Sequence, residues 1–257
     1  MSTIAYDVKQ GVAYLTIQSP PANALSSTIL QDLEVKLQKV EADKSVKAVV
    51  LTGEGRFFSA GADIKEFTSF QKASDSKALA QKGQQLFNRI EHFPIPVIAA
   101  IHGAALGGGL ELAMACHIRI VAKSAKLGLP ELTLGIIPGF AGTQRLPQHV
   151  GAAKAYEMIL TGDPISGEEA YYFGLANRIV DEDQLLHETS KLAEKIAEKS
   201  RPSIQHIMNL VPYAKTDLFD KGLEAEANAF KEVFGSEDAK EGIQAFLEKR
   251  KPDFKDE

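Results

Sequence analysis

The sequence predicts an α/β fold, in which helices pack on a sheet of buried strands and a helical part follows. Segments 48–51, 96–101 and 118–122 are almost continuously apolar, which is typical of strands buried on both faces of a sheet. Segments with helical periodicity separate them. The order strand, helix, strand, glycine loop, helix and strand favours an α/β core.

The N-terminal elements begin with a hairpin, because β-prone runs at 6–8 and 12–17 flank turn residues at 9–11. A helix is expected to begin near Ser26, a residue type that caps helices. Another covers residues 75–92. Each helix has apolar side chains at helical spacing and therefore one face to bury: Leu30, Leu33, Leu37 and Val40 in the first, and Leu79, Leu86, Phe87 and Ile90 in the second.

A shorter helix follows three glycines at 107–109 and extends to about residue 116. From residue 152 onward the pattern is entirely helical. Ser166 and Glu169 fit a capping box, and the short helix after them ends in glycine. Longer helices are expected near 183–199, 203–213, 217–234 and 237–247.

Length and charge limit the class of protein. The 257 residues suffice for one large domain, or one domain with a small appendage. A net charge of -5 argues against nucleic acid and anionic membranes as partners. The longest run without a formal charge, 93–110, contains prolines and glycines that would break a membrane-spanning helix. With neither a secretory nor an Arg-rich leader at the N-terminus, a soluble cytoplasmic protein is expected.

The metal-binding and redox-active residue types are sparse. Cys116 is the single cysteine, so an internal disulfide or a cysteine-rich zinc site is excluded. It lies in an apolar stretch, where a small core residue is a commoner role than a nucleophile. The six histidines have no zinc-like spacing, and no metal is expected.

Two glycine-rich loops are candidates for ligand contact. Residues 59–63 are mostly small, so a ligand can approach the backbone N–H groups. The alternative is a tight turn with Asp63 as a helix cap. The glycines at 107–109 expose N–H donors at the positive end of a helix. That loop lacks the Gly-Lys-Ser/Thr ending of a P-loop and the spacing of a dinucleotide fold, so a transient anion such as an enolate suits it.

Two isolated carboxylates lie in apolar surroundings. Glu111 is the only acidic residue between Glu91 and Glu131, and desolvation would raise its pKa toward neutrality. Glu131 precedes a Pro-Gly turn that would expose the N–H of Gly139. A buried structural hydrogen-bond network for Glu111, or a solvated surface position for Glu131, is the alternative for each alone. Together, the two favour an acid–base pair.

Three motifs in order resemble the enoyl-CoA hydratase (crotonase) family. They are Ala-Gly-Ala-Asp-Ile-Lys at 60–65, His-Gly-Ala-Ala-Leu-Gly-Gly-Gly-Leu-Glu-Leu-Ala at 102–113, and the segment from Pro130-Glu131 to Gly-Thr-Gln-Arg-Leu at 142–146. The likeness covers nearly the whole chain. It implies a spiral of β-β-α units over 1–195. A helical region over 196–257 would close the active site and form trimers, which usually pair into hexamers.

The resemblance also implies roles for individual residues. The backbone N–H groups of Ala62 and Gly108 would form an oxyanion hole for a thioester carbonyl. Glu111 and Glu131 would hold one water, with Glu131 supplying the α-proton as acid and Glu111 activating the water as base. Coenzyme A would contact residues in the first loop and two C-terminal positions: Ala60, Asp63, Ile64, Lys65, Phe230 and Lys249.

The function that follows is reversible syn addition of water to 2-enoyl-CoA, giving 3-hydroxyacyl-CoA in fatty-acid β-oxidation or related acyl-CoA degradation. Such a hydro-lyase needs no cofactor, because coenzyme A is part of the substrate. Where hydratases often have Gly-Ala-Gly-Gly-Thr, this chain has Gly-Phe-Ala-Gly-Thr at 139–143, and Phe140 places a ring near the water site or acyl pocket. The alternatives are a 3,2-enoyl-CoA isomerase or another reaction of the family, and a non-catalytic RNA- or CoA-binding protein on the same scaffold.

Overall fold

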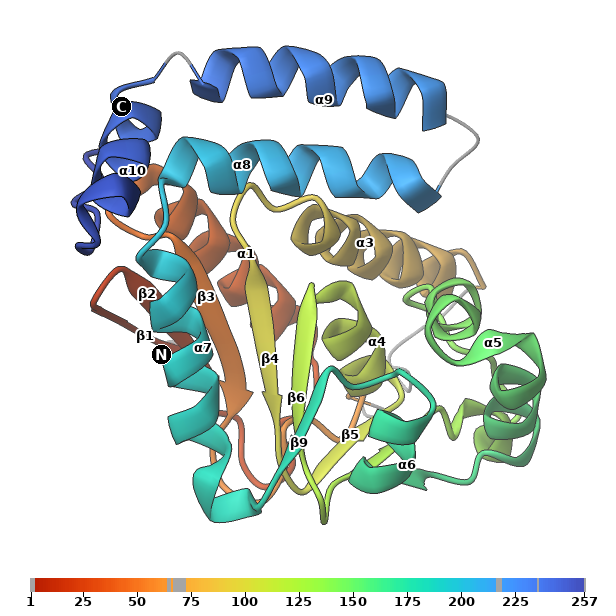
Figure 1. Cartoon of the computed structure of the whole chain (residues 1–257). Coiled ribbons are helices and arrows are strands. Elements are labelled where there is room, and N and C mark those ends of the chain that lie inside the picture. The colour runs from red at the N-terminus through yellow and green to blue at the C-terminus, as the bar shows by residue number, and fades with distance from the viewer. Residues whose placement is uncertain (1–2, 64–65, 67–72, 216–218, 235, 257) are drawn as a thin grey trace.

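The computed structural model describes residues 3–63, 66, 73–215, 219–234 and 236–256, and it has the α/β architecture that the sequence predicts (Figure 1). Within these residues the strands form a six-stranded sheet of order β1-β2-β3-β4-β6-β9 and a three-stranded sheet of order β5-β7-β8. The strands of the larger sheet are β1 (Ile4–Lys9), β2 (Val12–Ile17), β3 (Ala48–Gly53), β4 (Val97–Ile101), β6 (Ile118–Ala122) and β9 (Arg178–Val180).

The larger sheet is parallel except at its first edge. β1 and β2 form the expected antiparallel hairpin, with Ile4 opposite Ile17, and every later neighbour pairs in parallel. All residues of β3 and β4 are buried. These apolar strands are therefore covered on both faces, as their composition predicted.

The smaller sheet gives the fold its β-β-α repeat. It contains β5 (Ala104–Leu106), β7 (Lys126–Gly128) and β8 (Ile165–Ser166). β5 directly follows β4 and β7 directly follows β6, so each pair of consecutive strands is divided between the two sheets. Isolated bridges join Ser59 to Ala105 and Leu25 to Ala62. The loop at 59–62 is thereby fixed beside β5.

Helices cover one face of the larger sheet and bury its main core. α1 (Ser27–Ala42) begins after Ser26, whose side chain accepts a hydrogen bond from the N–H of Ile29. α3 (Ala73–Glu91) and α4 (Gly108–Ala115) follow. The predicted apolar stripe of α1 is buried throughout, and Phe87 and Ile90 of α3 are fully buried.

The prediction that the chain is entirely helical after residue 152 was wrong. The helix α5 (Gly142–Thr161) already begins at residue 142 and has a kink at Gly151. β8 and β9 then add strands of two and three residues, which are too short to show a period of two in the sequence. The capping box of Ser166 and Glu169 is present and starts α6 (Gly167–Tyr172).

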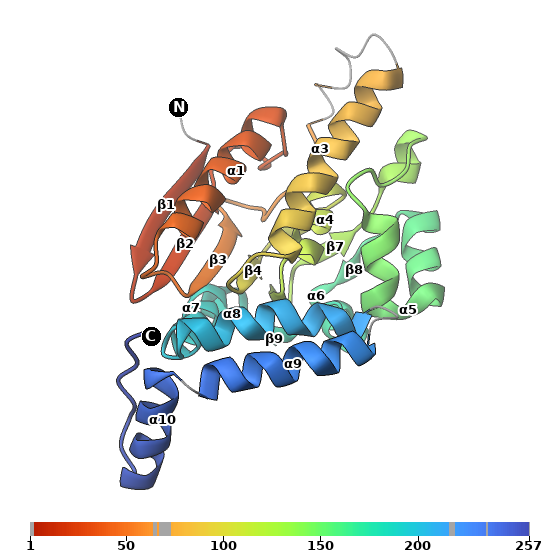
Figure 2. The ribbon, with the colours of Figure 1, turned by 90° about the horizontal axis from the view of Figure 1, so that it is seen from above.

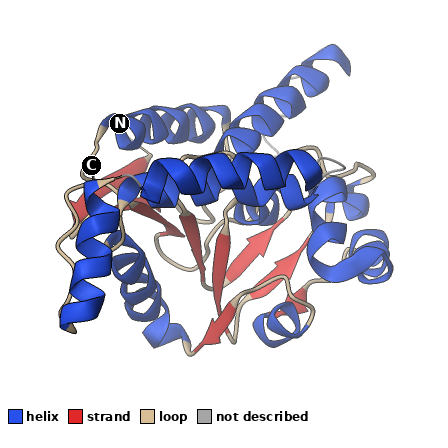
Figure 3. Ribbon diagram, turned by 45° about the horizontal axis from the view of Figure 1, so that its top comes forward, coloured by secondary structure: helices blue, strands red, loops and turns tan. Residues whose placement is uncertain are grey.

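The last four helices divide between the other face of the sheet and one end of the molecule. α7 (Leu185–Ala197) packs on β2, β3, β4 and β6 and buries a smaller core with them. α8 (Arg201–Leu210) and α9 (Phe219–Phe234) lie side by side, and α10 (Glu237–Glu248) projects beyond them (Figure 2). Helices thus surround the strands (Figure 3). The division expected between residues 195 and 196 falls in the last turn of α7 and stays a prediction.

Candidate active site

A cavity of about 870 Å³ opens where α3, the N-terminus of α4 and the segment 130–140 meet. Most of its lining is apolar, with Glu111 and Glu131 as its acidic side chains. Both carboxylates identified in the sequence therefore face one space. The remaining lining comes from the loop at 60–62, from α3, from Gly107 and Gly108, and from the residues around Glu131: Ala60, Gly61, Ala62, Lys77, Leu79, Ala80, Gln84, Pro130, Thr133, Leu134, Gly135, Ile136, Ile137, Pro138, Gly139 and Phe140.

Glu111 lies in the first turn of α4 and is only 1% exposed. Its Oε1 accepts hydrogen bonds from the N–H groups of Phe140, at 2.8 Å, and Gly142, at 2.6 Å. Burial raises the pKa of Glu111 to about 7, and the charge of Glu131 adds to that rise, while the two N–H donors and Arg145 oppose it. This carboxyl group can therefore exchange a proton near neutral pH.

Glu131 is the first residue of a 3₁₀ turn, η1 (Glu131–Leu134), and is half-buried. Its Oε2 is buried and has no hydrogen-bond partner among the residues that the structure describes. Burial also raises the pKa of this carboxyl group. Gly107 gives it room, since a Cβ on that glycine would lie 2.8 Å from Oε1 of Glu131. A residue with a side chain at 107 would push Glu131 aside.

Two backbone N–H groups border the same cavity. Gly108 is the first residue of α4, so its N–H has no partner within the helix. The N of Ala62 lies 3.4 Å from the position that a Cβ on Gly108 would occupy. In the described part of the chain neither N–H donates to an acceptor. Both N–H groups are therefore available to an acceptor in the cavity.

Asn23 and Ser59 hold the loop that carries Ala62. Asn23 is 2% exposed, and its Nδ2 donates to the carbonyls of Glu54 and Phe57 at 2.9 and 2.8 Å. The hydroxyl of Ser59 donates to the carbonyl of Asn23 at 2.8 Å. The sequence did not reveal Asn23 as a support of this loop, because its partners lie more than thirty residues away.

Arg145 was also missed as a supporting residue. It is buried on α5, and its guanidinium donates to Glu91 at 3.1 and 3.0 Å and to Oδ1 of Asn88 at 2.6 Å. Its Nη1 also donates to the carbonyl of Phe140 at 3.0 Å. Arg145 thus anchors α5 to α3 and fixes the turn whose N–H groups hold Glu111. Its only sequence signal was its place in the third motif.

The far end of α4 is closed by another buried cation. The guanidinium of Arg119 donates to the carbonyl of Cys116, at 2.6 Å, and to that of Leu175, at 2.6 Å. Burial lowers the pKa of Arg119 to about 10, which leaves it charged at neutral pH. Cys116 is buried as expected, and burial raises the pKa of its thiol to about 12. That thiol is therefore no nucleophile.

The other residues predicted for the site are only partly brought together. Ala60, Gly139 and Phe140 line the cavity. The N–H of Asp63 donates to the carbonyl of Leu25, and Ile64 and Lys65 lie outside the described residues.

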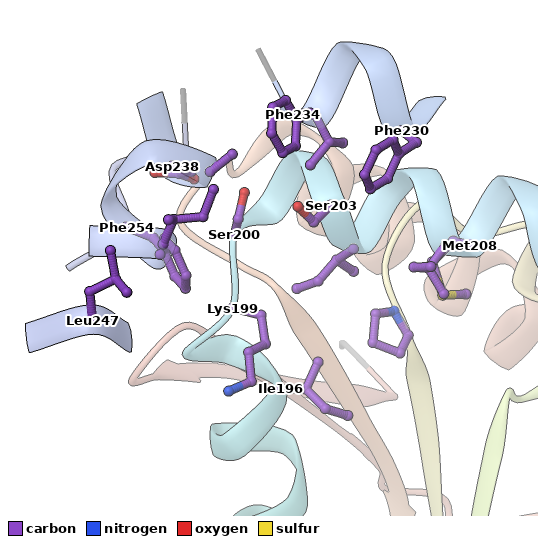
Figure 4. Close-up of a pocket in the computed structure, with 17 residues that line it drawn as sticks. Ile196, Lys199, Ser200, Ser203, Met208, Phe230, Phe234, Asp238, Leu247 and Phe254 are labelled. Carbon is purple, nitrogen blue, oxygen red and sulfur yellow. The ribbon is translucent and has the colours of Figure 1, made fainter. Parts of the chain in front are cut away.

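The two C-terminal candidates, Phe230 and Lys249, are absent from the cavity lining. Phe230 is 68% exposed and lines a separate, apolar cavity of about 850 Å³ between α8, α9 and α10 (Figure 4). Lys249 is exposed just after α10. Within one copy of the chain, neither residue is part of the surroundings of Glu111 and Glu131.

The described residues contain neither a metal-binding cluster nor a membrane-spanning helix. Among the described residues, His, Cys, Asp and Glu side chains form no group of three or more that could hold a metal ion. No described helix combines the length and the apolar character that crossing a membrane requires.

Comparison with known proteins gives full-length matches. The family described as "Enoyl-CoA hydratase/isomerase" matches residues 7–257. A "Probable enoyl-CoA hydratase" of Bacillus subtilis is 60% identical over all of both chains. The "Crotonyl-CoA hydratase" of Syntrophomonas wolfei is 40% identical over 98% of this chain and 97% of its own. The crystal structure of an enoyl-CoA hydratase from Bacillus anthracis superposes with a TM-score of 0.94 at 38% identity, covering 99% of this chain and all of that one.

Proposed function

The chain belongs to the enoyl-CoA hydratase/isomerase family, and we propose that it is a hydratase that adds water reversibly to 2-enoyl-CoA thioesters. The product is a 3-hydroxyacyl-CoA, as in fatty-acid β-oxidation or related acyl-CoA degradation. The observation that carries the proposal is one cavity in which two carboxyl groups of raised pKa face two backbone N–H donors.

In the proposed reaction, the thioester carbonyl accepts hydrogen bonds from the N–H groups of Ala62 and Gly108. Glu111 takes a proton from water as the water oxygen bonds to Cβ, and the π electrons of the alkene move to the carbonyl oxygen as an enolate. Glu131 then donates a proton to Cα, and the enolate returns to a thioester. The two glutamates restore their protonation states by exchanging a proton with each other or with solvent. Water is consumed and no electrons are exchanged with a redox partner, so the reaction requires no cofactor.

The magnitudes are sufficient for such catalysis. Removal of one oxyanion donor costs about 10²–10³ in rate in comparable enzymes, and positioned acid–base groups contribute about 10²–10⁴. Gly139 supports the turn, because its carbonyl accepts a hydrogen bond from Nε2 of Gln84 at 2.9 Å. We assign the adenine end of coenzyme A to the first loop, at Ala60, Asp63, Ile64 and Lys65, by likeness to the family.

We further propose that the protein assembles as a trimer, or as a hexamer of two trimers. The support is the cavity in Figure 4, which α8, α9 and α10 line with mostly apolar side chains. Phe230 on α9 and Leu247 on α10 are 68% and 69% exposed in one copy. A contact of Phe230 or Lys249 with coenzyme A then belongs to the active site of a neighbouring copy. A cytoplasmic location remains the expectation from the sequence.

The decisive experiment follows the loss of the conjugated-enoyl absorbance of crotonyl-CoA. We expect rapid loss with the wild type and a fall of at least about 10²-fold in kcat for Glu111→Gln and for Glu131→Gln. The exposed Glu157 of α5 gives a matched control, Glu157→Gln, with unchanged activity. Binding of coenzyme A, measured by calorimetry, should persist in all variants.

Two results would redirect the proposal. If the wild type does not hydrate crotonyl-CoA but converts a 3-enoyl thioester to the 2-enoyl isomer, the protein is an isomerase. If either glutamine variant hydrates crotonyl-CoA with the wild-type kcat, the glutamate that it replaces has no part in the mechanism.

A further inference from the structure

The ring of Phe140 fills the space between α3 and the first turn of α4. The residue is 5% exposed and borders the cavity. On one side a Cβ on Gly83 would lie 2.3 Å from Cδ1 of the ring and 2.4 Å from Cε1. On the other side a Cβ on Gly108 would lie 3.3 Å from Cδ2 and from Cε2. The ring is thus in contact with the backbones of two helices at once.

Further contacts leave this ring little freedom. Phe87 of α3 packs edge-on against it, with ring centroids 5.4 Å apart. The N–H of Phe140 donates to Glu111, and its carbonyl accepts from Arg145. The ring and the backbone of one residue therefore touch the candidate oxyanion donor and the candidate base.

The absence of a side chain at Gly83 makes room for the ring of Phe140. It lies in the interior of α3, where glycine costs about 1 kcal/mol of helix stability relative to alanine. Alanine at this position would place its methyl group 2.3 Å from Cδ1 of the ring, which is closer than non-bonded carbon atoms approach. The ring would have to move, and the backbone of Gly108 is its neighbour on the opposite side.

We propose that Phe140 is a positioning residue, whose ring is a spacer that α3 holds against Gly108 and that sets where the N–H of Gly108 meets the substrate carbonyl. The inference rests on the proposed function, because it requires Gly108 to be an oxyanion donor. Such donors act when they lie within a few tenths of an ångström of the right distance from the oxygen. A shift of the ring, which Gly83 contacts on the other side, should therefore change kcat more than it changes KM.

The test measures the carbonyl of a bound thioester directly. Butyryl-CoA carries no double bond to hydrate, so its ¹³C-labelled carbonyl stretch can be recorded by infrared difference spectroscopy while it is bound. In the wild type, hydrogen bonds from two donors should lower this frequency relative to free butyryl-CoA. In Phe140→Leu, we expect the frequency to return toward the free value and kcat for crotonyl-CoA to fall roughly 10-fold, less than the loss of a whole donor. KM should change by less than about 3-fold.

Gly83→Ala tests the same spacer from the opposite side. It should lower kcat and shift the carbonyl frequency although it leaves Phe140 in place. In the double variant Gly83→Ala/Phe140→Leu the added methyl occupies space that the ring has left. Its kcat should therefore exceed the product of the two single effects by several-fold, as expected for residues in contact.

The control is Phe93→Leu, which makes the same change at a fully buried phenylalanine after α3. It should lower the thermal unfolding midpoint to a similar extent and leave the carbonyl frequency unchanged. If Phe140→Leu folds and keeps both the wild-type frequency and the wild-type kcat, the spacer role is refuted. If Phe140→Leu does not fold, Gly83→Ala decides by the same two readouts. A wild type that does not shift the carbonyl at all would instead refute the oxyanion hole, and with it the proposed mechanism.

Discussion

At the scale of single residues, burial of the Glu111 carboxyl group makes the stability of the protein depend on pH. The folded protein holds its pKa near 7, compared with an ordinary value of 4.5. A folded-state pKa above the unfolded value means that the native state binds the proton more tightly. The stability from that proton is complete below pH 4.5 and is lost as the pH rises toward 7.

The change Glu111→Gln should therefore stabilise the protein in alkaline solution while it abolishes hydration. The amide oxygen can still accept from the N–H groups of Phe140 and Gly142, and no charge is buried. Relative to the wild type, the free energy of unfolding should be little changed near pH 4.5 and higher by roughly 3 kcal/mol near pH 8. Urea unfolding of both proteins across this pH range measures it. A pH-independent difference would contradict the raised pKa.

Sequence reasoning found the two carboxylates because each is isolated among apolar residues, a signal that needs no knowledge of distant contacts. It did not find Asn23 or Arg145 as supports of the site. Their hydrogen bonds reach segments that are between 5 and 57 residues away, and a polar side chain in a sequence does not reveal which carbonyl it will meet.

At the scale of elements, the loop that carries Ala62 depends on hydrogen bonds from a turn that is distant in the sequence, and Asn23 is the test case. Asn23→Ala would remove the donor that the carbonyls of Glu54 and Phe57 share. Each lost hydrogen bond costs about 0.5–1.5 kcal/mol, so we expect the free energy of unfolding to fall by about 1–3 kcal/mol. Because Ser59 of the loop at 59–62 donates a hydrogen bond to the carbonyl of Asn23, displacement of Asn23 should shift this loop and lower kcat as well.

The capping box of α6 supplies the comparison. Ser166→Ala removes a helix cap on the small sheet and should cost about 1 kcal/mol, with kcat unchanged because Ser166 does not line the cavity. Urea unfolding and the crotonyl-CoA assay, applied to both variants, separate a loss of stability from a loss of site geometry. Equal effects of the two variants on kcat would show that Asn23 has no special role in the site.

Most of the longer elements were predictable from their periodicity. Apart from α5, the long helices and the three apolar strands of the core were expected within a few residues of where they lie. β8 and β9 were missed, because two or three residues carry no periodicity and their pairing is fixed by β7 and β6. The start of α5 at Gly142 was missed because its cap, Ala141, has a left-handed backbone and no side-chain hydrogen bond to reveal it.

At the scale of the whole molecule, the exposed apolar side chains of α9 and α10 set an expectation for assembly. Contiguous exposed apolar surface of this kind marks a protein–protein contact. Leu247→Glu should convert the assembly into smaller species in light scattering coupled to size exclusion. Val35 on α1 is also exposed, and Val35→Glu should leave the mass unchanged. A wild type that is monomeric at micromolar concentration would contradict the assembly.

The two ends of α4 differ in their surroundings. The carbonyl end is neutralised inside the protein by the guanidinium of Arg119, whereas the N–H end faces the cavity. The positive charge of Arg119 thus lies at the negative pole of the helix, and the positive pole borders the cavity. An uncharged side chain at position 119 would leave the carbonyl of Cys116 without this donor and would loosen α4 at its far end, about 12 Å from the cavity along the helix.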